Sequence, residues 1–189
     1  HFGRTDFRPW NGSYWPTHKG ILARRYSDPD FPDSSDWYEN YIYVQSANPE
    51  YLLLSGRVDQ LSPAEKYDLL LEDRGWTLTR AMWQRGQDVA NTHDGRVPSW
   101  WGICHGWSAA NHMRTPEPQH AIQVKSASGE FGINFYPADL EALVAYLWAE
   151  SSPATLLIGS KCNGMTPGTN AYGRPLDPTC LDNNPKSWH

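Results

Sequence analysis

Cys104 is the residue of this chain whose type and setting best suit nucleophilic chemistry. Residues 99–107 read Ser-Trp-Trp-Gly-Ile-Cys-His-Gly-Trp. A loop containing Pro98 and Gly102 leads into a stretch that can form a helix, so we expect Cys104 at a helix N-terminus. There the positive end of the helix dipole favours a thiolate, and unpaired backbone N–H groups can stabilise an oxyanion. The alternative is an inert thiol buried in the core.

A cysteine nucleophile needs a histidine that takes up its proton and later delivers it to the leaving group. Seven histidines are available: His1, His18, His93, His105, His112, His120 and His189. The nearest is adjacent to Cys104, but two successive helical side chains point about 100° apart. Residue types alone do not choose the base among the others.

The remaining cysteines flank a turn-rich stretch near the end of the chain. Cys162 and Cys180 are separated by 17 residues, 163 to 179. A disulfide across a loop of this size stabilises by about 3 kcal/mol in the chain-entropy model. A zinc site lacks the expected CxxC or nearby histidine spacing, although free thiols or metal ligands remain alternatives. The predicted disulfide indicates an oxidising compartment and therefore secretion.

Composition and charge exclude several other classes of protein. The net charge is −5, and no block of about five basic residues occurs, which argues against a nucleic-acid partner. No apolar run approaches ~18 residues, so we expect no membrane span. Aromatic residues make up 13% of the chain, and such rings serve either in a core or on a carbohydrate-binding surface. A Trp-rich binding module without catalysis is therefore an alternative to an enzyme.

The elements that must position Cys104 follow from turn residues and periodicity. Residues 1–50 are predicted to be irregular, apart from a strand at 41–45. A helix is predicted from 63 to about 73, where Ser62 and Glu65 can form a capping box. Further helices are predicted over 77–85, from 104, and from 137 to before 153, the last with an apolar face of Leu140, Leu143, Val144 and Leu147. Strands are predicted at 121–125, 132–136 and 155–159, with loop from 160 onward.

Several blocks of the sequence resemble, in the same order, the transglutaminase-elicitor family, whose known members are secreted oomycete cell-wall transglutaminases and bacterial relatives. The block around the cysteine reads Trp-Gly-Ile-Cys-His-Gly-Trp-Ser-Ala-Ala (101–110), followed by Pro-Glu-Pro (116–118). The other blocks are Ser-Tyr-Trp-Pro (13–16), Phe-Tyr-Pro-Ala-Asp-Leu-Glu-Ala-Leu (135–143), Gly-Ser-Lys-Cys-Asn (159–163), Tyr-Gly-Arg (172–174), residues 177–185 and Trp-His (188–189).

The resemblance implies a papain-like Cys-His-Asp active site on an α+β fold, with Cys104 as nucleophile and His189 as general base. It also implies that Cys162 and Cys180 match a family cysteine pair, and that calcium is required. In the family the acidic third member lies after the histidine, whereas this chain ends at His189. We therefore expect residues 1–189 to form a single catalytic domain whose C-terminal part is absent or carried by a second chain. The start at His1 rather than Met suggests a processed product or a fragment.

The predicted activity is protein cross-linking between glutamine and lysine through a Cys104 thioester. Trp100 or Trp101 could contribute an indole N–H at the oxyanion or exclude water, although both are equally suited to a core. A secreted papain-like cysteine peptidase would use the same residues and is the closest alternative. An acidic cluster could offer oxygen ligands to calcium; it consists of Asp28, Asp30, Asp33 and Asp36. The cluster lacks the pattern of an EF-hand, and a solvated acidic loop is the simpler interpretation. No metal ligand is assigned.

Overall fold

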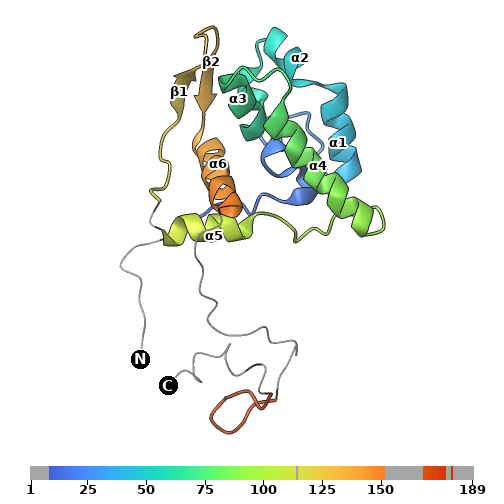
Figure 1. Ribbon diagram of the computed structural model, residues 1–189, viewed down its shortest axis with the longest axis vertical. Coiled ribbons are helices and arrows are strands. Elements are labelled where there is room, and N and C mark those ends of the chain that lie inside the picture. Colours follow the sequence, from blue (N-terminus) through green and yellow to red (C-terminus); the bar gives the residue numbers. More distant parts are fainter. Residues whose placement is uncertain (1–8, 114, 152–167, 178–179, 181–189) are drawn as a thin grey trace. The chain divides into compact units, whose positions relative to one another are not determined.

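The structure of the protein is a computed structural model that describes residues 9–113, 115–151, 168–177 and 180 (Figure 1). The chain divides into two compact units, His1–Ser151 and Ser152–His189. The first unit contains Cys104 and all the named helices and strands of the described residues.

Helices dominate the first unit, and its only described sheet is a two-stranded hairpin. The α-helices are α1 (Trp37–Ser46), α2 (Pro49–Leu54), α3 (Pro63–Leu70), α4 (Thr77–Thr92), α5 (Cys104–His112) and α6 (Pro137–Glu150). Short 3-10 helices are η1 (Thr17–Lys19), η2 (Ile21–Ala23) and η3 (Val58–Gln60). Strands β1 (Ile122–Lys125) and β2 (Gly132–Phe135) pair antiparallel, with Ile122 opposite Phe135. This content is compatible with the predicted α+β class.

Aromatic side chains fill the centre of this unit. Trp37 of α1 and Trp83 of α4 are buried with their ring centroids 6.2 Å apart, and Trp15 packs edge-on against Tyr26. Because an aromatic side chain buries about 150–250 Å², a few such rings supply much of the packing area. A second apolar cluster lies under the hairpin and consists of Leu52, Leu61, Leu69, Ile133 and Phe135.

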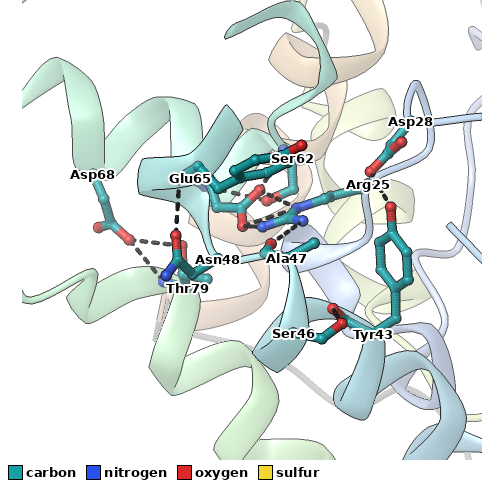
Figure 2. Close-up of polar contacts among 11 residues, drawn as sticks. Arg25, Asp28, Tyr43, Ser46, Ala47, Asn48, Ser62, Glu65, Asp68 and Thr79 are labelled. Carbon is teal, nitrogen blue, oxygen red and sulfur yellow. Dashed lines mark hydrogen bonds and ion pairs between the residues drawn. The ribbon is translucent and has the colours of Figure 1, made fainter. Parts of the chain in front are cut away.

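Buried charges link the N-terminal segment to α3. Arg25 and Glu65 are both fully buried, with Nη2 and Oε1 2.6 Å apart, and Arg25 Nη1 donates to the Ala47 carbonyl (Figure 2). Glu65 also accepts from the backbone N–H of Ser62, whose hydroxyl accepts from the N–H of Glu65. This is the predicted capping box at the start of α3, and it is confirmed.

Two further carboxylates tie helices together. Asp68 of α3 accepts from the backbone N–H groups of Leu78 and Thr79 and from the Thr79 hydroxyl, so it caps the first turn of α4 (Figure 2). Burial raises the pKa of Asp68, although the Thr79 hydrogen bonds oppose the shift. Asp139 of α6 binds Lys66 Nζ at 2.6 Å and accepts from the Tyr26 hydroxyl at 2.9 Å. Burial and the Asp139 carboxylate raise the pKa of Tyr26.

The prediction for the first 50 residues is wrong in part. The segment predicted as a strand at 41–45 lies inside α1, and α2 begins at Pro49. Asp36 caps α1 by accepting from the N–H of Tyr38, and Tyr41 stacks on Trp37 one helical turn earlier. These local contacts outweigh the β propensity of the sequence Tyr-Ile-Tyr-Val.

Other boundaries differ by a few residues. Helix α3 ends at Leu70 rather than near 73, and α4 continues to Thr92 rather than 85. The predicted hairpin and the helices at Cys104 and Pro137 are confirmed. The apolar face predicted for α6 is wrong in part. Leu140 and Leu143 pack against the cluster under the hairpin, but Leu147 is 69% exposed, and the fully buried positions are Asp139, Ala142 and Ala145.

Of the second unit, the structure describes residues 168–177 and 180. Residues 168–177 form a turn closed by a bridge between Thr169 and Pro175, and Asn170 Oδ1 accepts from the N–H groups of Tyr172 and Arg174. The predicted strand at 155–159 lies outside the described residues.

Candidate active site

Cys104 is the first residue of α5 and is exposed with a free thiol, as the sequence predicts for a reactive rather than a core cysteine. The first-turn N–H groups of Gly106 and Trp107 donate to the Ile103 carbonyl at 3.0 and 3.3 Å. The N–H groups of Cys104 and His105 have no hydrogen-bond partner within the described residues. An exposed thiol therefore lies beside unpaired donors at the positive end of a helix.

The loop before Cys104 is held by the segment 14–17. The N–H of Ile103 donates to the Tyr14 carbonyl at 2.9 Å, and the N–H of Thr17 donates to the Trp101 carbonyl at 2.8 Å. The Tyr14 hydroxyl donates to the Ser99 carbonyl at 2.8 Å. A Cβ on Gly102 would overlap the Tyr14 carbonyl oxygen, so only glycine allows this close approach. The segment 14–17 thus fixes the backbone immediately before the thiol.

Close packing against α6 fixes the helix that begins with Cys104. A Cβ on Gly106 would overlap the Ala145 carbonyl oxygen and would lie 2.7 Å from Ala149 Cβ. Ala110 and Ala145 are also buried, so the facing surfaces of α5 and α6 consist of small side chains. Backbones can approach this closely only where side chains are small. The resulting contact sets the position of the α5 N-terminus.

Two tryptophans predicted to lie at the oxyanion or to exclude water are stacked beside this loop. Trp100 and Trp101 lie with ring centroids 5.3 Å apart at an interplanar angle of 7°. Trp100 is 74% exposed, so it is not a core residue, whereas Trp101 is half-buried and meets the His93 ring edge-on at 5.0 Å. His93 in turn hydrogen-bonds the Val89 carbonyl through Nδ1 at 3.0 Å. The end of α4 therefore supports the tryptophan pair.

None of the histidines in the described part of the chain hydrogen-bonds Cys104. His112 Nδ1 is bound to the Ser108 carbonyl at 2.7 Å, and His18 is buried, which lowers its pKa. His189, the predicted base, lies outside the described residues, and so does His1. The assignment of the base to His189 stays a prediction.

The predicted disulfide is described at one end only. Cys180 is buried, with its N–H donating to the Asp177 carbonyl at 3.0 Å, while Cys162 lies outside the described residues. The pairing of these two cysteines stays a prediction.

The four aspartates considered for calcium are each engaged by protein groups. Asp30, which is exposed, lies 3.8 Å from Arg57 Nη1. Asp28 is buried and accepts from the Tyr43 hydroxyl at 2.9 Å; burial and this bond raise the pKa of Tyr43 to about 12. Asp33 binds Lys19 and Arg24, and Asp36 caps α1. In the part of the chain that the structure describes, no three acidic, cysteine or histidine side chains are grouped as metal ligands. These residues do not fit a calcium site, and the interpretation as a solvated loop is wrong for Asp28.

Residue-by-residue reasoning missed the groups that position Cys104. Gly106 appears in the sequence as one of 15 glycines, and nothing local distinguishes it from a turn glycine. Tyr14 stands out in the sequence only as part of the Ser-Tyr-Trp-Pro block of the family resemblance, and that block does not indicate what the residue does. The structure gives both a role: Tyr14 holds the loop before Cys104, and Gly106 lets α5 approach α6.

Comparison with known proteins identifies one family. A family model described as "Transglutaminase elicitor" matches residues 2–189. No curated protein and no solved structure matches the chain.

Proposed function

Because the chain belongs to the transglutaminase elicitor family, we propose that it is an acyltransferase that joins protein glutamine and lysine side chains through Cys104. The observation that carries the proposal is the exposed, free thiol at the first position of α5, beside N–H groups that have no partner within the described residues. A thiol kept only for packing would be buried.

In the first half-reaction the Cys104 thiolate attacks the γ-carboxamide carbon of a glutamine. A carbon–sulfur bond forms and the negative charge moves to the amide oxygen, which accepts hydrogen bonds from the N–H groups of Cys104 and His105 in our proposal. Collapse breaks the carbon–nitrogen bond. The imidazolium of His189, our proposed acid and base, gives its proton to the departing nitrogen, which leaves as ammonia.

In the second half-reaction a lysine ε-amine attacks the thioester. The isopeptide bond forms, the amine loses a proton to His189, and the Cys104 thiolate is released. Water can attack instead and convert the glutamine to glutamate. Because bulk water outnumbers any amine, exclusion of water decides the outcome. The exposed Trp100, stacked on Trp101, is a flat apolar surface that can cover the thioester when a substrate binds.

The protein is proposed to act outside the cell. The support is the predicted Cys162–Cys180 disulfide, which requires an oxidising compartment. In the described part of the chain, no helix is long and apolar enough to cross a membrane.

The experiment is Cys104→Ala, assayed by incorporation of a fluorescent primary amine into casein. We expect a loss of roughly 10³-fold or more, because the thioester cannot form. Thermal unfolding should be unchanged, because the side chain is exposed. Cys104→Ser is the matched variant that keeps the size and a weaker nucleophile.

Two outcomes would contradict the proposal. The first is that the unmodified protein cleaves a fluorogenic peptide but incorporates no amine, and that Cys104→Ala loses the cleavage. This result would show a cysteine peptidase. Equal amine incorporation by the unmodified protein and Cys104→Ala would exclude this thiol from the chemistry. As a further measurement, Trp100→Ala should raise the ratio of glutamate formed to amine incorporated.

A further inference from the structure

A concave site lies between α1 and α4, and no residue next to Cys104 lines it. Its volume is about 710 Å³, within the range of about 300–1,000 Å³ that is typical of small-molecule pockets. The lining comes from α1, the start of α2, Trp76 and α4, and includes no residue of the segment 99–112. Figure 1 shows α1 and α4 lying side by side, and the ring contact between Trp37 and Trp83 joins them.

Aromatic rings form the floor of this pocket. Trp37 and Tyr41 are stacked with centroids 4.9 Å apart at 11°, and the Tyr41 ring lies 5.8 Å from that of Trp83. Trp37 and Trp83 are buried, whereas Tyr41 and Trp76 are only half-buried. The last two therefore have ring surface left for a ligand. The electron-rich face of such a ring attracts the slightly positive hydrogens of a C–H surface.

Side-chain amides form the rim. Gln84 Nε2 donates to Asp88 at 2.8 Å and Gln87 Nε2 donates to Asn91 at 3.0 Å, so both amide oxygens are left as acceptors. Asn48 Oδ1 accepts from the N–H of Tyr51 at 2.9 Å, so its amide nitrogen is left as a donor. Within the described residues, the rim therefore combines donors and acceptors that have no protein partner.

The charges of the lining residues indicate which chemical class of ligand fits the pocket. Among the described residues no carboxylate lines the pocket, and Arg80, which is exposed, is the only charged residue of that lining. A cation would find no counter-charge, and a wholly apolar ligand would cover the rim amides without satisfying them. A ligand that fits has an apolar face for the floor and neutral groups that both donate and accept for the rim. A pyranose ring has both, because its C–H groups lie on one face and its hydroxyls project from the edge.

We propose that the α1–α4 pocket binds a neutral oligosaccharide, with a sugar ring on Tyr41 or Trp76 and its hydroxyls on the amides of Gln45, Asn48, Gln84 and Gln87. This binding site is separate from the thiol chemistry and would place the protein on a glycan or glycoprotein. It does not depend on the proposed function, since none of its residues contacts Cys104.

The test is calorimetric titration of the Cys104→Ala protein, in which no acyl transfer can confuse the signal. The probes are cellohexaose, maltohexaose and chitohexaose as neutral sugars, hexagalacturonate as an anionic sugar, and an apolar fluorescent dye. We expect at least one neutral hexasaccharide to bind. Tyr41→Leu, which keeps apolar bulk but removes the ring, should weaken that binding by about tenfold. Gln45→Ala should weaken it less.

The matched control is Tyr38→Leu, because Tyr38 lies on the same helix, is exposed and does not line the pocket. It should bind the same sugar unchanged, and thermal unfolding will show that all three variants are folded. Binding of hexagalacturonate alone would overturn the proposal, and so would binding of the dye alone or of no probe. Equal loss in Tyr38→Leu and Tyr41→Leu would also overturn it.

Discussion

The polar core around Arg25 and the segment around Cys104 are built from opposite kinds of contact. In the polar core, Arg25, Glu65, Lys66 and Asp139 are charged and fully buried, and each carboxylate has several partners. Figure 2 shows the Arg25–Glu65 pair. Around Cys104 the contacts described are backbone hydrogen bonds and small-residue packing, and the thiol itself is exposed.

The difference separates what holds the fold from what can do chemistry. A buried charge without its partner costs several kcal/mol, so the polar core specifies one arrangement of η2, α3 and α6. The backbone hydrogen bonds from the segment 14–17 hold the Cys104 loop without using its side chains. The loop can therefore be rigid while its thiol stays accessible. Changes in the first region should therefore lower stability, and changes in the second should lower activity.

The largest expected effect on stability is that of Arg25→Met. This change leaves the Glu65 carboxylate buried without its cation and the Ala47 carbonyl without its donor. The free energy of unfolding should fall by about 3–5 kcal/mol, as measured by urea denaturation. The fraction that remains folded should keep the proposed amine-incorporating activity, because no hydrogen bond or ion pair among the described residues joins the polar core to Cys104.

The double variant Arg25→Met/Glu65→Leu sharpens this result. Removing both charges should recover most of the lost stability, less about 1 kcal/mol for the capping box that Glu65 completes with Ser62. A fall of less than about 1 kcal/mol in the single variant would contradict a buried ion pair in solution.

The sequence predicted the parts of each region that depend on local signals. The capping box needs only residues 62–65, and α5 needs only the change from loop to helix at Cys104, so both were found. The Arg25–Glu65 pair joins positions 40 residues apart, and the contact of Tyr14 with Ser99 spans 85 residues. No local pattern encodes such pairs. Helix α1 was missed because the stacking of Tyr41 on Trp37 overrides the β propensity of its sequence.

Gly106→Ala is expected to have the next largest effect and to act on both stability and activity. The added Cβ would overlap the Ala145 carbonyl oxygen and force α5 away from α6. Overpacking of this kind costs about 1–3 kcal/mol. A shift of the α5 N-terminus by about 1 Å would lower amine incorporation by roughly 10²-fold.

The control for that change is Gly132→Ala in β2, where the nearest atoms to an added Cβ lie 3.6 Å away. It should leave both stability and activity close to those of the unmodified protein. If Gly106→Ala lowers stability but leaves the activity of the folded protein intact, the packing of α5 on α6 does not position the thiol.

The smallest expected effect comes from an exposed ion pair, which is the counterpart of the polar core on the surface. Partial burial favours the neutral form of Asp33, but hydrogen bonds from Arg24 and Lys19 outweigh it and lower its pKa. Since the folded-state pKa lies below the unfolded value of about 3.9, the contribution of Asp33 to stability is fully present above that pH and is lost as the pH falls through the folded value.

Asp33→Asn should cost about 0.2–1 kcal/mol at neutral pH, because the Asp33 side chain is 40% exposed. Urea denaturation should show this difference shrinking at low pH and in 1 M salt, while the effect of Arg25→Met stays large in salt. A difference that persists unchanged in both conditions would mean that Asp33 acts through backbone structure rather than through charge.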